Sequence, residues 1–147
     1  MTSFQKRSLS ALGMIFLAAG LSFGRTVPDP DAAKALADRI MTKAAADDMD
    51  GVFGLIKPYL DISAEEIDTD RVKSKQSMEV LRPKYGPPTG FEFIDSRTVG
   101  SSLLRLRYVQ NNAKLPFVWV FDFYKTEKGW TMSNFNWNVD VFAGLFK

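Results

Sequence analysis

Apolar residues recur at three- and four-residue spacing after Pro30, and this period predicts an amphipathic helix over residues 30–46. Asp29 is a suitable N-cap for this helix, and proline is well tolerated at the first helical position. A short apolar run over residues 52–56 is followed by Pro58. It predicts a second, short helix that ends one or two residues after the proline.

A capping box begins at Ser63, where a glutamate follows three residues later. It predicts one turn of helix, and Asp68 or Asp70 could cap a further helix that ends close to Pro83. Turn-forming residues are then dense over residues 85–90, so we expect the helical part of the chain to end there.

From residue 91 onward, the helical spacing gives way to alternation of apolar and polar residues. The pattern predicts four strands joined by short turns, at residues 91–99, 102–110, 116–126 and 130–142. Helices followed by consecutive strands are typical of the α+β class. We expect a single domain over residues 25–147.

The two central strands have one apolar face and one polar face. The register that keeps the apolar residues together pairs Leu104 with Phe123, Leu106 with Phe121 and Tyr108 with Trp119. It also places Arg105 opposite Asp122 on the other face. The simplest consequence is an aromatic face that packs on the helices, with an arginine–aspartate pair outside.

The last strand is less regular than the central ones. Simple alternation places Trp130 and Met132 on one face and Phe135 and Trp137 on the other, so the pattern allows a β-bulge near Ser133. Three asparagines then share a face, namely Asn134, Asn136 and Asn138.

Most aromatic residues of the chain follow residue 90, where they could line a ligand pocket in a curved sheet. Aromatic residues are also the usual material of a core. Tyr108, Trp119 and Trp137 are the better candidates for ligand contact, because each carries a polar tip on an apolar ring.

The start of the chain has a different composition from the rest. Two basic residues precede an unbroken apolar and small stretch over residues 9–24 that contains no acidic residue. This layout is typical of a cleavable secretory signal, and the stretch is shorter than the roughly 20 residues of a membrane-spanning helix. Ser22 and Gly24 fit a cleavage site, so we expect a cut after Gly24. Ala18 with Gly20 offers a second site.

Removal of residues 1–24 takes away two of the 19 basic residues and none of the 17 acidic ones, so the remaining domain is neutral. A neutral domain gives no indication of a nucleic-acid partner, and membrane contact is expected only through the signal during export. The chain also lacks cysteine and histidine. We therefore expect no disulfide, no zinc site of the usual ligands, and no histidine- or thiol-based catalysis.

Acidic and basic residues are segregated in the middle of the chain. Five acidic and no basic residues lie over residues 61–70, without the glycine and final glutamate of an EF-hand loop. Acidic residues near helix starts are stabilised by the helix dipole. Five basic residues follow over residues 71–84. They form either a solvated helix face or a surface for the acidic patch of a partner, including a second copy of the chain.

Four short motifs accompany this order of elements. They are Phe121-Asp122-Phe123-Tyr124-Lys125, Gly129-Trp130, Phe135-Asn136-Trp137 and Leu145-Phe146. With the Tyr-Gly-Pro turn and the strand meander, the chain resembles the NTF2-like superfamily, also described as ketosteroid isomerase-like or cystatin-related. More narrowly, it is similar to small exported proteins of that fold with no assigned function. The resemblance implies N-terminal helices packed on a curved four-stranded antiparallel sheet, the NTF2-like cone.

The resemblance also bears on catalysis. Enzymes of the superfamily use an acidic base with tyrosine or acid donors in the cone, or a histidine–aspartate pair, and this chain has no histidine. Asp122 and Tyr108 are the nearest substitutes, but the predicted register places them on opposite faces. We therefore expect no catalytic residue, metal or cofactor.

The leading hypothesis is an exported, non-catalytic domain, either periplasmic or secreted. It would bind a small apolar ligand or a protein partner of the cell envelope through the cone mouth or the sheet face. Two alternatives stay open. One is a cone-pocket enzyme that uses acid–base chemistry on a small organic substrate, and the other is a self-associating module that forms a homodimer through an exposed Val118 and Val120 face.

Overall fold

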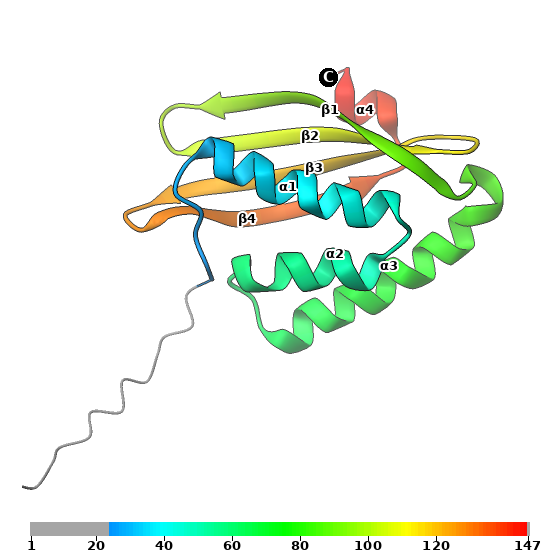
Figure 1. Ribbon diagram of the computed structural model, residues 1–147, viewed down its shortest axis with the longest axis horizontal. Helices are drawn as coiled ribbons and strands as arrows, with labels where there is room; N and C mark the ends of the chain where they lie inside the picture. Colours follow the sequence, from blue (N-terminus) through cyan, green and yellow to red (C-terminus); the bar gives the residue numbers. More distant parts are fainter. Residues whose placement is uncertain (1–23, 147) are drawn as a thin grey trace, which may run out of the picture.

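The computed structural model describes residues 24–146 (Figure 1). The elements, in chain order, are α1 (Pro30–Ala45), α2 (Met49–Ile56), the 3-10 turn η1 (Lys57–Tyr59), α3 (Ala64–Tyr85), β1 (Pro88–Val99), β2 (Leu103–Asn112), β3 (Phe117–Thr126), β4 (Gly129–Asn138) and α4 (Val141–Leu145). The strands form one antiparallel sheet in the order β1-β2-β3-β4, which confirms the predicted α+β class.

Most of the predicted signal, residues 1–23, lies outside the described residues. Within the described part of the chain, no helix is both long and apolar enough to cross a membrane.

Local capping determines where the first two helices begin. Asp29 accepts a hydrogen bond from the amide of Ala32 at 2.7 Å, so α1 begins directly after it, as predicted. Asp48 accepts one from the amide of Gly51 at 2.8 Å. This cap starts α2 three residues before the apolar run that predicted it.

The third helix is longer than the sequence pattern indicated. The capping box is confirmed, because Ser63 Oγ accepts from the Glu66 amide at 3.1 Å and the Glu66 carboxylate accepts from the Ser63 amide at 2.9 Å. The expected break after one turn is wrong. Asp68 and Asp70 lie inside one continuous helix, which runs through Pro83 and ends two residues later. The missing amide of Pro83 leaves the carbonyl four residues earlier without its helical donor, and the helix ends two residues after the proline.

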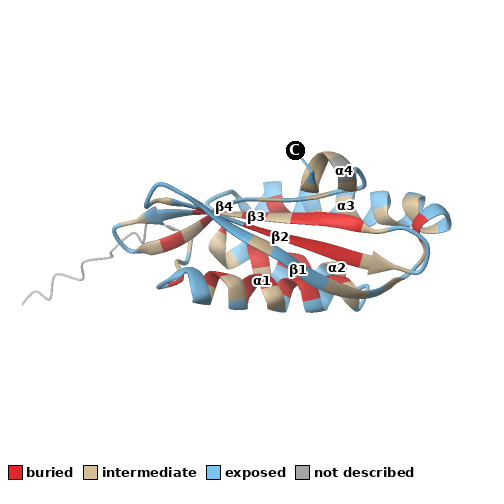
Figure 2. Cartoon of the chain, turned by 90° about the horizontal axis from the view of Figure 1, so that it is seen from above, coloured by how far each residue is buried: buried red, intermediate tan, exposed pale blue. Residues whose placement is uncertain are grey.

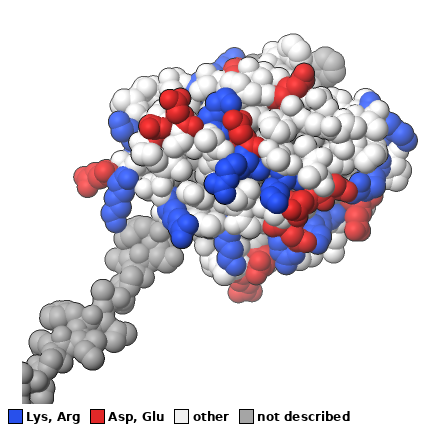
Figure 3. Space-filling view, viewed as in Figure 1, with Lys and Arg blue, Asp and Glu red and all other residues white. Residues whose placement is uncertain are grey.

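Ion pairs hold α3 beside the start of α2. Asp50 pairs with Arg71 at 2.9 Å and with Lys75 at 2.9 Å, and Asp47 pairs with Arg82 at 2.8 Å. Acidic and basic side chains are accordingly interspersed over these helices (Figure 3). Exposed pairs of this kind are individually weak, because water screens them. Three of the five basic residues of the 71–84 segment are therefore already engaged within the fold.

The predicted register of the central strands is confirmed. Leu104 lies opposite Phe123, Leu106 opposite Phe121 and Tyr108 opposite Trp119. All of these side chains are buried between the sheet and the helices (Figure 2). The residues that alternate with them in β2 and β3 point to the other face of the sheet. On that face Arg105 lies opposite Asp122, as expected.

The outer strands carry three register shifts, one of them at the start of β1 between Pro88 and Gly90, and the other two decide which of the later residues join each face. In β4, the shift at Ser133 is the predicted bulge, and it brings Trp130, Met132, Phe135 and Trp137 to the helix-facing side. In β1, a shift between Phe93 and Asp95 was not predicted. It leaves Phe93 on the inner face and turns Asp95 outward. Both changes follow from the extra residue that a bulge inserts.

The end of the chain corrects two expectations. The last strand stops at Asn138 instead of continuing to residue 142, and α4 follows it across the outer face of the sheet (Figure 1). Asp140 caps this helix by accepting from the amide of Ala143 at 2.9 Å. The α4 helix packs on Val118, which is only 1% exposed, and Val120 is half-buried. The expected exposed valine face for self-association is therefore wrong, because α4 covers part of it.

The polar atoms of the buried aromatic side chains have hydrogen-bond partners within the protein. The Tyr108 hydroxyl donates to Asp38 Oδ1 at 2.7 Å, and Trp119 Nε1 donates to Gln110 Oε1 at 2.8 Å. Gln110 is itself 2% exposed and donates to Asn112 at 2.9 Å. The polar tips that suggested a pocket are thus satisfied within the fold.

We predict that Gln110→Leu lowers the free energy of unfolding by about 1–3 kcal/mol, because it leaves the buried Trp119 Nε1–H without an acceptor. Urea denaturation measures this loss. In a Trp119→Phe background the same substitution should cost clearly less, since no indole donor remains. Additive effects of the two substitutions would contradict the assigned role of the hydrogen bond.

Candidate functional site

The structure places the three predicted pocket residues in two different environments. Tyr108 and Trp119 are 0% exposed and lie beneath the helices. Burial, reinforced by the hydrogen bond to Asp38, raises the pKa of Tyr108 well above its usual range, so its hydroxyl stays protonated. Trp137 is half-buried and borders an open groove. A role of the three in ligand contact stays a prediction, and Trp137 is the one at a surface.

That groove lies between α3 and the free edge of β4. It has a volume of about 440 Å³. Its apolar lining comes from Leu60, Ile62, Phe135 and Trp137, and its polar lining from Asp70, Lys73, Ser74, Ser133 and the three asparagines of β4. Trp137 Nε1 lies 3.5 Å from Ser74 Oγ across the groove. We call it the α3–β4 groove.

The strand that borders this groove has an unprotected edge. Residues 133–138, here called the β4 edge, contain no charged residue and no proline. Within residues 24–146, the backbone of this segment pairs only with β3. The opposite edge of the sheet is different, because β1 carries Pro88, Glu92, Asp95 and Arg97 along with a bulge. Charges, prolines and bulges are the usual means of blocking an edge strand. The β4 edge has only its bulge, at Ser133.

Rows of side chains cross the outer face of the sheet. The charged row comprises Arg97, Arg105, Asp122 and Asn134, in strand order. A second row comprises Asp95, Arg107, Val120 and Asn136. The apolar row, at the end of the sheet, comprises Val99, Leu103 and Tyr124. The members of the apolar row are 66%, 47% and 47% exposed, respectively.

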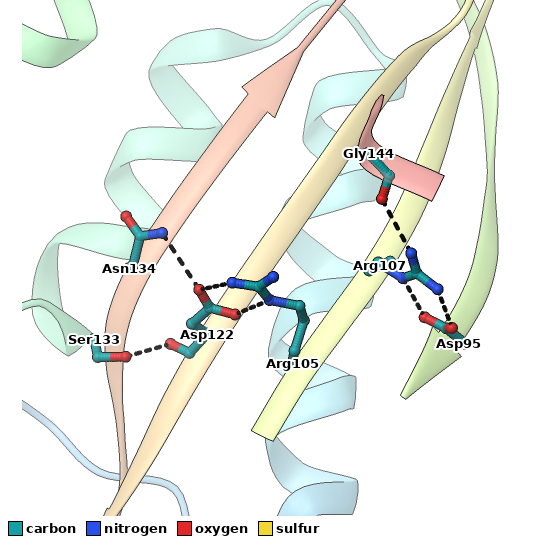
Figure 4. Close-up of polar contacts among 7 residues, drawn as sticks. All are labelled: Asp95, Arg105, Arg107, Asp122, Ser133, Asn134 and Gly144. Carbon is teal, nitrogen blue, oxygen red and sulfur yellow. Dashed lines mark hydrogen bonds and ion pairs between the residues drawn. The ribbon is translucent and has the colours of Figure 1, made fainter. Parts of the chain in front are cut away.

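Two bidentate ion pairs organise the outer face (Figure 4). Arg105 donates from Nε and Nη2 to the two carboxylate oxygens of Asp122, at 2.7 and 2.9 Å. Arg107, which is 6% exposed, donates in the same manner to Asp95. Its Nη1 also donates to the Gly144 carbonyl at 3.0 Å, so this guanidinium ties β1 and β2 to the end of α4.

A third arginine is left with a weaker partner. Arg97 approaches Asp95 at 3.4 Å, but both oxygens of that carboxylate already accept from Arg107. Arg97 lies directly opposite Arg105 on the neighbouring strand, and its side chain is 62% exposed. Three guanidiniums therefore share the carboxylates of Asp95 and Asp122, while the other acid of this face, Glu92, lies further along β1, opposite Val109.

The outer face also carries the larger groove. It has a volume of about 610 Å³ and extends from the apolar row to α4. Its lining includes all three arginines, Asp122, Val120, Phe123, Ala143 and Gly144. We call it the outer groove.

The arrangement gives little support for catalysis. Asp122 lies on the outer face and Tyr108 on the inner face, as predicted. The acid that does meet Tyr108 is Asp38, which also pairs with Lys34 at 2.8 Å. Neither Asp38 nor Tyr108 borders the α3–β4 groove or the outer groove. Within residues 24–146, no group of three acidic side chains is placed to hold a metal ion.

No family model matches the chain, and no curated protein matches it significantly. A solved domain of unknown function with a cystatin-like fold, from Nostoc punctiforme, is similar with a TM-score of 0.50. The two are 14% identical, and the match covers 83% of this chain and 85% of that domain. The chain has an NTF2-like, cystatin-like fold.

A Campylobacter jejuni protein described as an NTF2-like transpeptidase is also similar, with a TM-score of 0.45 and 15% identity. The match covers 69% of this chain and 97% of that one. At 14% identity, the similarity to the Nostoc domain extends to the fold and not to an activity.

Two features of the site were missed by reasoning from the sequence. The buried Arg107–Asp95 pair depends on the β1 bulge, and no turn residue or break in the β1 sequence marks that bulge. The α4 helix was taken for the end of the last strand, although Asn138 and Asp140 are typical of a helix start and could have indicated it.

We predict that stability falls at acidic pH through Asp95. The guanidinium of Arg107 lowers the pKa of Asp95 below its ordinary value of 3.8. A lowered pKa in the folded state adds stability above the ordinary value, and this stability is lost as pH falls through the folded pKa. Urea denaturation between about pH 6 and pH 2.5 should show this loss in the wild type.

The Asp95→Asn variant should lose about 1–3 kcal/mol at neutral pH, because Arg107 loses its charged acceptor. It should also show a shallower decline in acid than the wild type. Glu92→Gln is the control, since Glu92 is an exposed acid on the same strand. An equal acid decline in the wild type and Asp95→Asn would contradict the prediction.

Proposed function

We propose that this protein is an exported, non-catalytic binding domain that takes up an extended segment of a protein partner at the β4 edge. The observation that carries the proposal is the unpaired, uncharged β4 edge beside the α3–β4 groove. A helix facing a free strand edge across a groove is the geometry in which proteins add a partner strand to their own sheet.

Backbone hydrogen bonds would provide much of the binding. A strand that adds to the β4 edge satisfies amides and carbonyls that otherwise meet only water. Alternate side chains of the added strand would point into the groove, where Ile62, Phe135 and Trp137 offer apolar contacts. The proposal therefore favours a segment with alternating apolar residues.

Two free charges on α3 could orient the segment. Asp70 and Lys73 line the groove, and neither has an ion pair within the described residues. They lie three positions apart on the helix, so they face the groove together. A segment with a basic and an acidic residue at matching spacing would satisfy both.

The packing of the interior supports a protein segment over a small apolar ligand in the cone. Tyr108 and Trp119 are covered, and their polar atoms already have partners. Opening the cone would expose this aromatic core to water. The α3–β4 groove is accessible without any such change.

Export is the second part of the proposal. The amide of Arg25 donates to the Pro58 carbonyl at 2.6 Å, and Val27 forms a two-way backbone pair with Trp130 at 2.8 Å. Cleavage after Gly24 would leave both contacts in place, because the new amino group at Arg25 can still donate to Pro58. We predict that the protein from the envelope or medium of its host has the intact mass of residues 25–147. A full-length mass in a cytoplasmic fraction would overturn export.

The partner can be identified by photocrosslinking in the host envelope. We would place p-benzoylphenylalanine at Lys73, which lines the groove, and at Arg39, an exposed residue of α1, as the control. The expected result is one protein crosslinked from Lys73 and not from Arg39. The crosslinked segment would then be synthesised and its affinity measured.

Matched substitutions on one helix test whether the groove is the site. Ser74→Trp fills the α3–β4 groove, whereas Ser77→Trp puts the same side chain on an exposed position of α3 outside it. The first should weaken peptide binding at least about tenfold, and the second should leave it unchanged. Hydrogen exchange should show protection of the β4 edge amides. Equal effects of the two variants, or binding without that protection, would contradict strand addition.

A further inference from the structure

We infer that the outer groove is a second binding site, for a free long-chain carboxylate such as a fatty acid. This site lies on the opposite face of the sheet from the α1 and α2 layer and shares only Ser133 with the lining of the α3–β4 groove. The inference therefore does not depend on the proposed protein partner.

Around Arg97 and Arg105 there is one guanidinium more than there are carboxylates, because Glu92, the third acid of the face, lies at the other end of β1. Three guanidiniums share the carboxylates of Asp95 and Asp122, and the surplus falls on Arg97. Arg97 also lies directly opposite Arg105, and like charges in that position on neighbouring strands repel. A single carboxylate between Arg97 and Arg105 would remove this repulsion and neutralise the cluster.

Arg97 and Arg105 can both make this contact without losing their present partners. Arg105 uses Nε and Nη2 for Asp122, which leaves Nη1 available (Figure 4). Arg97 uses only Nε, at 3.4 Å from Asp95. Both side chains are more than half exposed, at 62% and 55%, so a ligand can reach them.

The apolar row supplies the second half of the site. Val99, Leu103 and Tyr124 lie one step along the sheet from the charged row, about 7 Å away. All three are exposed, and Val99 and Leu103 line the outer groove, with Tyr124 next to Leu103 on the neighbouring strand. Since the row crosses three strands, it is about 10 Å long and suits an extended alkyl chain. The groove volume of about 610 Å³ is within the range of small-molecule sites.

Other occupants use only part of this surface. An inorganic anion would contact the arginines and leave the apolar row exposed. A second copy stacked on the same face would bring the surplus positive charge of each copy against the other, and α4 projects from that face. A monoanion with one apolar chain matches both the single surplus charge and the single apolar row.

The experiment is a titration of residues 25–147 with decanoate below its micellar concentration. Calorimetry and native mass spectrometry measure the binding. We expect one molecule bound per chain. Affinity should rise about twofold to fourfold per methylene from octanoate to decanoate, until the apolar row is filled. Decanol, which has the chain without the charge, should bind more weakly than decanoate.

Variants then separate the two halves of the site. Arg97→Gln should weaken decanoate binding about fivefold and leave decanol binding unchanged. Leu103→Ser should flatten the dependence on chain length. Arg39→Gln removes the same charge from α1, away from the outer face, and should have no effect.

Three results would overturn the inference. They are no binding of decanoate, equal binding of decanoate and decanol, and equal effects of Arg97→Gln and Arg39→Gln. Binding of acetate as tight as that of decanoate would show an anion site without a chain site, and would also overturn it. None of these results affects the crosslinking from Lys73, so the two proposals fail separately.

Discussion

Alternation along the two central strands is the constraint on which the rest of the structure depends. One set of side chains in β2 and β3 is aliphatic or aromatic and the other set is largely polar, so only one face of the sheet can be buried beneath the helices. Tyr108 and Trp119 belong to the buried set, and their polar atoms find partners within it. The opposite face keeps its arginines and aspartates at the surface, where they pair with one another.

Two bulges adapt the outer strands to this division. Without the shift at Ser133, Trp137 would face away from the helices. Without the shift before Asp95, Arg107 would lie under α4 with no carboxylate beside it. A bulge thus affects residues beyond its own position, because one extra residue moves every later side chain of the strand to the other face of the sheet.

Because aromatic side chains fill the interior of this fold, both proposed binding sites lie at its surface. Tyr108 and Trp119 are fully buried beneath the helices, and the α3–β4 groove and the outer groove, the two proposed binding sites, lie at the surface. The α3 helix borders the first of these and is joined to α2 by exposed ion pairs, while Ile67 and Tyr85 are its buried core residues. Since its apolar contribution to the core is small, α3 can adjust to an added strand at little cost to the sheet.

Local patterns in the sequence determined the starts of α1 and α3, the four strands and the β2–β3 register, because caps and alternation act between neighbours in the chain. They also indicated the Arg105–Asp122 pair and the bulge at Ser133. The length of α3, the β1 bulge, the packing of α4 on the outer face and the Arg107–Asp95 pair were decided only by the tertiary structure. Each depends on a contact with a distant element, such as the α2 acids that hold α3 or the α4 carbonyls that meet Arg107. The sequence pattern of one segment contains no information on which distant element packs against that segment.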